Sequence, residues 1–269
     1  MSIVTISRGS YTRGREVAEK LSEKLNHNLI SREILIEASE QFNISEIKLE
    51  RALNDPLSVL DRFSNGRNRY IAYIQNAILN YMINDNVVYH GLAGHALVPK
   101  VRHILRIRIR ADMEDRIKRE SERENISEEE ARYLLSKDDD ERRKWSIHVT
   151  GKDPCDPSQY DIVFNASTID VEDMVNIIAQ IVQQPYMENI PESQKLLEDL
   201  AKASKIKTQL IKKYPSVQVH VEDQIATIYL QASLEQENSL VRAVKQDMQK
   251  IEAVQDLKEA RVNVSPWLA

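Results

Sequence analysis

The chain has 269 residues, which is enough for one large domain or two smaller ones. Hydrophobic residues make up 42% and charged residues 29%, so the chain can build a folded core. The 37 Lys and Arg are outnumbered by 42 Asp and Glu, and the net charge of -5 argues against a general nucleic-acid or anionic-membrane binder. The single cysteine, Cys155, excludes an intramolecular disulfide and fits a reducing compartment. Because we find neither a secretory signal nor an apolar run long enough to span a bilayer, we expect a cytoplasmic protein without a transmembrane segment.

Short β-branched runs alternate with helical patterns in the first two thirds of the chain. Strands are predicted over residues 3–6, 87–89, 104–109 and 162–164. A polar turn over residues 7–14 leads into a predicted helix over 16–25, and residues 31–81 are mostly helical around Pro56 and a break at 64–66. A charge-dense helical stretch and an amphipathic helix over 170–182 complete this part. Strand, turn and helix in this order predict a parallel α/β unit.

A domain boundary is predicted at residues 184–192, where Pro185 and Pro191 lie in a polar segment. The pattern after it reads helix 193–213, strand 217–221, strand 225–230, helix 239–251 and strand 260–264, with a tight connection at 222–224. We therefore predict domains over residues 1–184 and 193–269, the second a small α+β unit.

The first turn has the spacing of a phosphate-binding loop, G-x-x-x-x-G followed by a basic residue. Such a loop points backbone N–H groups at phosphate, and the helix that follows adds partial positive charge. Arg15 stands where Lys is usual, and Glu16 stands where a Mg²⁺-binding hydroxyl is usual. On spacing alone, a simple glycine-containing turn between a strand and a helix is the alternative.

Residues 106–144 contain twelve Lys and Arg and thirteen Asp and Glu. A capping box at Ser127 and Glu130 predicts the start of a second helix after a break at Asn125. One interpretation is a pair of solvated helices connected by ion pairs. The alternative is a mobile lid whose arginines, Arg142 and Arg143, neutralise phosphates, with Asp139 to position them.

Four stretches together resemble the cytidylate kinase-like family of P-loop nucleoside monophosphate kinases. They are residues 6–17 (I-S-R…G-R-E-V), 28–33 (N-L-I-S-R-E), 116–132, and 139–165, which includes T-G-K-D and D-P-S-Q-Y-D-I-V-F-N. The resemblance covers about residues 1–184. It implies a three-layer α/β fold of the P-loop NTPase type, with a parallel sheet and a helical lid.

The resemblance also implies ATP-dependent phosphorylation of a nucleoside monophosphate with Mg²⁺. Arg15 and Arg142 would be catalytic, with Asp139 orienting Arg142, and Arg32 would lie near the monophosphate. No residue is assigned to a metal. The residues implied to bind ATP are Gly9, Ser10, Tyr11, Thr12, Arg13, Gly14, Arg15 and Glu16.

Three departures from the family pattern favour a second hypothesis. The turn at residues 89–94 lacks the usual Arg, Asp138 stands where a basic residue is common, and Ser31 replaces a carboxylate. The alternative is therefore a catalytically degenerate, nucleotide-binding regulator. Residues 217–230 resemble the BON module, which implies small-ligand or membrane binding; a generic α+β unit that mediates homodimers is the other interpretation of 193–269.

Overall fold

The computed structural model describes residues 2–8, 11–31, 33–42, 66–91, 94–98, 100–233 and 236–266. The chain divides into two compact units, Met1–Arg62 with Asn84–Asn189, and Phe63–Ile83 with Ile190–Ala269. The helix over residues 66–82 thus belongs to the second unit although it precedes most of the first in sequence. The domain limits at 184 and 193 stay a prediction. Pro56 and residues 64–65 of the predicted break at 64–66 lie outside the described residues, and Gly66 begins a helix.

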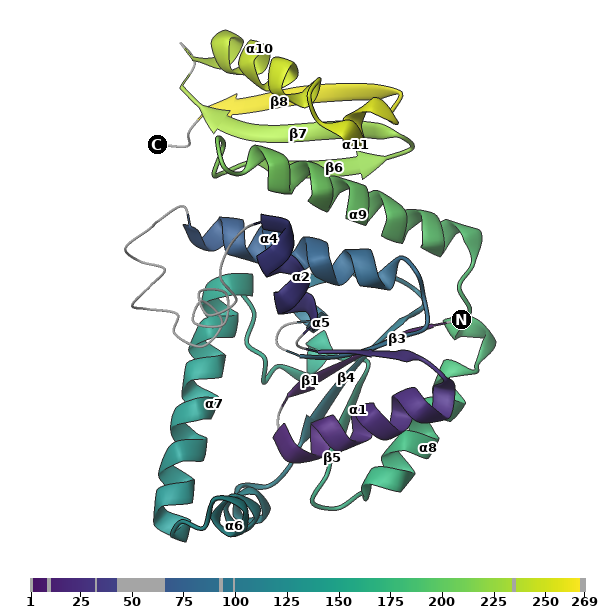
Figure 1. Ribbon diagram of the computed structural model, residues 1–269, viewed down its shortest axis with the longest axis vertical. Coiled ribbons are helices and arrows are strands. Elements are labelled where there is room, and N and C mark those ends of the chain that lie inside the picture. Colours follow the sequence, from purple (N-terminus) through teal and green to yellow (C-terminus); the bar gives the residue numbers. More distant parts are fainter. Residues whose placement is uncertain are drawn as a thin grey trace. The chain divides into compact units, whose positions relative to one another are not determined.

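The first unit is a parallel β-sheet with flanking helices (Figure 1). Its strands are β1 (Ile3–Arg8), β2 (Asn28–Ile30), β3 (Val87–Gly91), β4 (Ile104–Arg110) and β5 (Ile162–Asn165). Its helices are α1 (Tyr11–Leu25), α2 (Glu33–Phe42), α5 (Gly94–Leu97), α6 (Met113–Glu124), α7 (Glu128–Thr150) and α8 (Val171–Val182), with 3-10 turns η1 (Pro157–Gln159) and η2 (Pro185–Met187).

The sheet has the strand order β2-β3-β1-β4-β5, and every pair is parallel. β1 is central, and its side chains from Ile3 to Ile6 are buried on both faces, as is typical of a parallel strand covered by helices. The strands predicted at 3–6, 87–89, 104–109 and 162–164 are confirmed.

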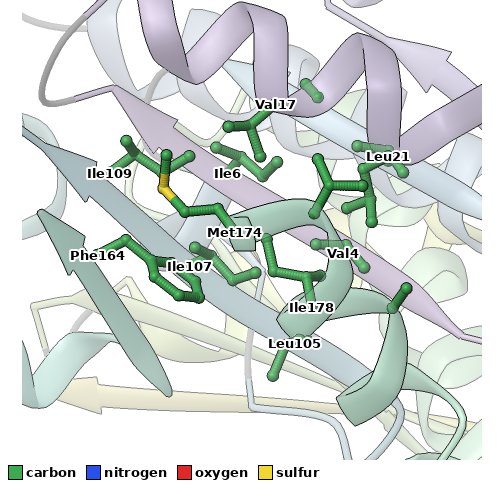
Figure 2. Close-up of a cluster of buried hydrophobic side chains, with 14 of the residues drawn as sticks. Val4, Ile6, Val17, Leu21, Leu105, Ile107, Ile109, Phe164, Met174 and Ile178 are labelled. Carbon is green, nitrogen blue, oxygen red and sulfur yellow. The ribbon is translucent and has the colours of Figure 1, made fainter. Parts of the chain in front are cut away.

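The core of this unit lies between the sheet and the pair of helices α1 and α8, which pack against each other. Figure 2 shows Met174 and Ile178 of α8 among side chains of α1, β1 and β4. The residues Val17 and Leu21 lie four apart on α1 and are fully buried, so one face of the helix points to the sheet. Asp170 caps α8 by accepting a hydrogen bond from the Asp173 N–H at 2.9 Å, which stops the helix from starting earlier.

The second unit contains the small α+β arrangement that the sequence predicts for residues 193–269, together with the helix over residues 66–82, which the sequence pattern assigns to the first domain. It comprises α4 (Gly66–Met82), α9 (Pro191–Leu210), β6 (Gln218–Glu222), β7 (Ile225–Ala232), α10 (Glu237–Met248), α11 (Glu252–Gln255) and β8 (Glu259–Pro266). β7 pairs antiparallel with β6 and parallel with β8, and α9 packs on both α4 and β6. Asp223 and Gln224 both adopt positive φ, 51° and 65°, which suits a two-residue hairpin turn. No helix among the described residues is long and apolar enough to cross a membrane.

A core substitution tests this packing. Met174 is fully buried, whereas Ile177 on the same helix is 39% exposed. We expect Met174→Ala to lower the free energy of unfolding by about 2–5 kcal/mol because it leaves a cavity. Ile177→Ala is expected to cost about 1 kcal/mol or less. Urea denaturation measures both, and equal losses would contradict the packing of α8.

A buried histidine lies at the amino end of β4. The His103 side chain is fully buried, and its backbone carbonyl accepts a hydrogen bond from the Ile3 N–H at 3.0 Å. Burial lowers the pKa of His103 below its usual value, and the nearby Asp85 only partly opposes this shift. The folded protein therefore binds this proton less readily than the unfolded chain does.

This pKa shift predicts acid sensitivity. Stability from neutral His103 is present above the unfolded pKa of about 6.5 and is lost as the pH falls below it. Between about pH 7.5 and pH 5.5, we expect the free energy of unfolding to fall more steeply for the wild type than for His103→Asn. Urea titrations at each pH give the slope of the free energy of unfolding against pH for both proteins. Equal slopes would contradict the predicted effect of His103 protonation.

Candidate active site

The carboxyl ends of four strands meet at one edge of the first unit's sheet. Ser7 of β1 lies beside Gly91 of β3 and Arg108 of β4, and the pair Arg110–Asn165 closes the ladder between β4 and β5. Ligands of open parallel sheets bind outside this edge. Helix α1 begins directly after β1, so its amino end and partial positive charge lie here.

The predicted phosphate turn is shorter in the structure than the sequence suggests. The prediction of a turn over 7–14 and a helix from 16 is wrong in its limits, because β1 continues to Arg8 and α1 already begins at Tyr11. Gly14 is therefore helical. A Cβ atom there would meet Nε2 of His90 at 3.3 Å, so glycine permits the close approach of α1 to β3. Gly9 and Ser10, two of the predicted ATP-binding residues, lie outside the described residues.

The side chains of Arg15 and Glu16 point outward from α1. The Arg15 side chain is 63% exposed, and its Nε donates to Oε1 of Glu19 at 2.8 Å. Glu16 is also exposed and lies 3.9 Å from the ammonium of Lys20. The described members of the predicted ATP-binding residues 9–16 thus lie together at the start of α1, but the side chains of Arg15 and Glu16 point to solvent. Arg32, the predicted monophosphate residue, lies outside the described residues.

Helices α6 and α7 form the charged hairpin that the sequence predicts as a lid. Asn125 ends α6 in a left-handed conformation with φ 54°, and Ser127 caps α7 by accepting from the Glu130 N–H at 3.2 Å. The break and the cap are both confirmed. Arg132 of α7 also pairs with Glu114 of α6 at 2.9 Å, so the two helices are connected by charge.

The two predicted lid residues have other partners than expected. We expected Asp139 to orient Arg142. Instead, Asp139 accepts two hydrogen bonds from Arg116 of α6, at 2.5 and 2.9 Å, and Arg142 pairs with Asp138 at 2.5 Å. The reason is helical spacing: Asp138 lies four residues before Arg142 on one stripe, while Asp139 faces α6. That orienting contact is therefore a wrong prediction, whereas the catalytic roles of both residues stay predictions.

The motif T-G-K-D at residues 150–153 ends α7 and fastens the segment after it. Gly151 adopts φ 71° at the helix end, as a C-terminal glycine does. Asp153 pairs with Arg143 at 2.7 Å and accepts from the Cys155 N–H at 2.9 Å, and Arg143 is the main reason that the pKa of Asp153 lies below its usual value. Farther on, the Tyr160 hydroxyl donates to the Pro154 carbonyl at 2.9 Å and lies 3.4 Å from Oγ of Ser7. This segment therefore reaches the end of β1.

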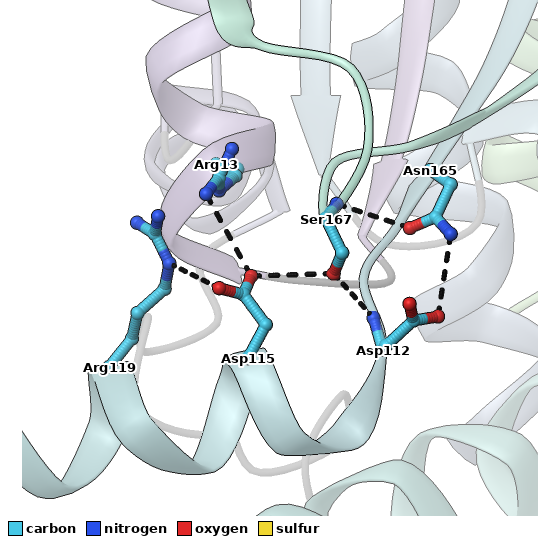
Figure 3. Close-up of polar contacts among 6 residues, drawn as sticks. All are labelled: Arg13, Asp112, Asp115, Arg119, Asn165 and Ser167. Carbon is cyan, nitrogen blue, oxygen red and sulfur yellow. Dashed lines mark hydrogen bonds and ion pairs between the residues drawn. The ribbon is translucent and has the colours of Figure 1, made fainter.

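A polar network connects α1, α6 and the loop after β5 (Figure 3). Asp115 lies 3.8 Å from Nη2 of Arg13 and accepts from Oγ of Ser167 at 3.4 Å. The same Oγ accepts from the Asp112 N–H at 2.9 Å, and Asn165 Nδ2 donates to Asp112 Oδ1 at 3.4 Å. Sequence reasoning missed the two aspartates, although Asp112 lies two residues after β4 and Asp115 in the first turn of the next helix, which is a usable signal at the carboxyl edge.

Within the described ranges, no group of three or more His, Cys, Asp or Glu side chains is placed to hold a metal ion. The guanidinium of Arg13, by contrast, is a cation with a buried donor at this edge, which fits a phosphate. This edge thus presents a buried cationic donor that suits an anionic group.

Comparison with known proteins agrees with this architecture. The model of the cytidylate kinase-like family matches residues 3–168. A cytidylate kinase of Sulfolobus acidocaldarius is 27% identical over 169 residues, which are 62% of this chain and 87% of that protein.

Two solved structures are also similar. An uncharacterised protein from Eubacterium ventriosum has a TM-score of 0.51 and 21% identity, covering 67% of this chain and 97% of that one. Shikimate kinase from Bacteroides thetaiotaomicron has a TM-score of 0.42 and 12% identity, covering 68% and 99% of the two chains. The predicted fold class, a P-loop kinase-type α/β sheet with a second small α+β unit, is confirmed. Because the family match runs from β1 past the end of β5 and spans more than half of the sequence, the chain belongs to the cytidylate kinase-like family and is, at that level, a nucleotide kinase.

Proposed function

We propose that the protein is an ATP-dependent nucleoside monophosphate kinase that transfers the γ-phosphoryl group of ATP to a cytidylate-like acceptor. The family match over residues 3–168 carries this proposal, because it includes the phosphate turn, the charged hairpin and the strand that ends at Asn165. The relative from Sulfolobus acidocaldarius, a cytidylate kinase, suggests the class of acceptor.

The proposed reaction needs positioning and charge rather than a covalent intermediate. A phosphate oxygen of the acceptor bonds to the γ-phosphorus, the bond from that phosphorus to the β–γ bridging oxygen breaks, and ADP leaves. The residues at 9–16 would hold the phosphates of ATP through backbone N–H groups and the amino end of α1. Mg²⁺ would arrive with those phosphates, and the proposal assigns it to no side chain.

The lid arginine would act by exchanging partners. Arg142 now pairs with Asp138, and its side chain is 21% exposed. In the proposed closed state it leaves that carboxylate and contacts the transferred phosphoryl group, whose charge spreads over three oxygens. Asp139 would hold α7 at the right distance through its two hydrogen bonds to Arg116. Arg32 is proposed at the acceptor phosphate.

A regulator is the second candidate function. The outward direction of Arg15 and Glu16 favours it, because the general phosphate-loop motif G-x-x-x-x-G-K-[ST] directs a cation and a hydroxyl from those two positions to the bound phosphates and Mg²⁺. In this alternative the chain binds a nucleotide without turnover, and residues 193–269 bind a small ligand or mediate homodimers.

A turnover assay separates the two candidates. We expect ADP production from ATP and Mg²⁺ to depend on one or a few members of a panel of ribo- and deoxynucleoside monophosphates. Samples without acceptor give the background rate. A flat panel, with ATP still raising the melting temperature, would favour the regulator.

A pair of lid variants tests the role of Arg142. We expect Arg142→Ala to lower kcat by about 100-fold or more, because it removes a cation that stabilises charge in the transition state. Arg132→Ala is the matched control: Arg132 lies on the same helix and pairs with Glu114 but is 52% exposed. Initial rates at saturating ATP measure both, and equal effects would reject a catalytic role for Arg142.

A further inference from the structure

The two arginines in the first turns of α1 lie on opposite faces of the helix. Successive residues of an α-helix are rotated by about 100°, so Arg13 and Arg15 are separated by about 200°. Arg15 is 63% exposed and pairs with Glu19 along the outer face, whereas the Arg13 side chain is only 15% exposed. The inner cation at the start of α1 is therefore Arg13.

The hydrogen-bonding capacity of the Arg13 guanidinium is poorly used in this structure. Its contact with Asp115 is 3.8 Å, which is an ion pair but too long for a hydrogen bond. Its Nε is buried and has no hydrogen-bond partner in the part of the chain that the structure describes. A buried donor without a partner destabilises the folded state. The Arg13 guanidinium carries five N–H donors in a planar fork, and the Nε–H is the one that is buried and without a partner.

The place of Arg13 indicates what would satisfy it. Figure 3 shows its guanidinium above Asp115, at the amino end of α1 and beside the loop that follows β5. This is the carboxyl edge of the sheet, where the proposed function places the phosphates of ATP. The planar fork of Arg matches two phosphate oxygens.

Asp115 is anchored well enough to position this side chain. Besides its contact with Arg13, it accepts a hydrogen bond from Oγ of Ser167 at 3.4 Å, whereas its i,i+4 pair with the 41% exposed Arg119 is a surface contact that adds little. Its carboxylate is thus fixed by α6 and by the loop after β5. The Asp115 carboxylate keeps the Arg13 guanidinium at the carboxyl edge of the sheet. At 3.8 Å it leaves the N–H donors of that guanidinium available to a stronger acceptor.

We propose that Arg13 is a phosphate-binding side chain of this site and that Asp115 positions it. The proposal rests on the function proposed above and gives the Arg13 side chain a role there beside the backbone N–H groups of residues 9–16, a role that sequence spacing does not reveal. Because Asp115 belongs to the first turn of α6, phosphate bound to Arg13 would also be connected to the base of the lid.

The test compares Arg13→Gln with Arg119→Gln. Both variants remove one positive charge next to Asp115, but the Arg119 side chain is 41% exposed, whereas that of Arg13 is 15% exposed. Titration calorimetry with two probes, Mg²⁺-ATP and inorganic tripolyphosphate, measures binding to the full chain. We expect Arg13→Gln to weaken binding of both probes by about 10- to 100-fold and Arg119→Gln by less than about threefold.

Two further measurements separate phosphate binding from a structural role. A mere structural ion pair predicts a lower melting temperature without ligand for Arg13→Gln, whereas the proposal predicts an unchanged or higher one, because an unsatisfied buried cation is removed. Arg13→Lys keeps the positive charge but lacks the planar guanidinium, so its tripolyphosphate binding should lie between that of Arg13→Gln and that of the wild type.

The outcomes distinguish this inference from the proposed function. If Arg13→Gln binds both probes like the wild type while the wild type phosphorylates an acceptor, the role of Arg13 is wrong and the kinase stands. If the wild type binds ATP without turnover and Arg13→Gln loses that binding, the role of Arg13 stands and the kinase fails. Equal losses in Arg13→Gln and Arg119→Gln would overturn the inference.

Discussion

Hydrogen bonding of β1 between β3 and β4 is the constraint on which the first unit depends. It places the end of β1 in the middle of the carboxyl edge, with Gly91 on one side and Arg108 on the other. Because all five strands are parallel, every crossover returns the chain to the opposite edge, and the segments that follow β1, β4 and β5 converge. Arg13, Asp115 and Ser167 come from these three segments, so their meeting is a consequence of strand order.

Sequence patterns predict the strands well because burial on both faces requires continuous β-branched runs, such as residues 3–6. The start of α1 is harder, since the glycines and polar residues at 7–14 are typical of a turn and only packing against His90 shows that Gly14 suits a helix. The partner of Asp139 lies 23 residues away on another helix. Local spacing gives no information on such a contact, and it cannot tell which of two nearby arginines faces inward.

The arginines of this unit are mostly held by carboxylates. Arg116, Arg142 and Arg143 each have an aspartate at 2.5–2.7 Å. Because the charge of the hairpin is nearly balanced, its arginines do not repel one another before a phosphate binds. When a phosphate binds, each arginine exchanges a carboxylate partner for a phosphate oxygen. The sequence count of twelve basic and thirteen acidic residues over 106–144 is consistent with this arrangement.

Because α4 belongs to the second unit but precedes most of the first in sequence, its position limits how the chain can be shortened. The chain returns to the first unit at residues 83–84 and leaves it at 189–190, so α4 is separated in sequence from α9, on which it packs. A chain cut after residue 189 would keep α4 and lose α9, and the face of α4 that α9 covers would meet water and favour aggregation. The second unit is therefore built from two separate segments of the sequence. Removing the second unit as a whole requires the removal of α4 as well as of the residues after 189.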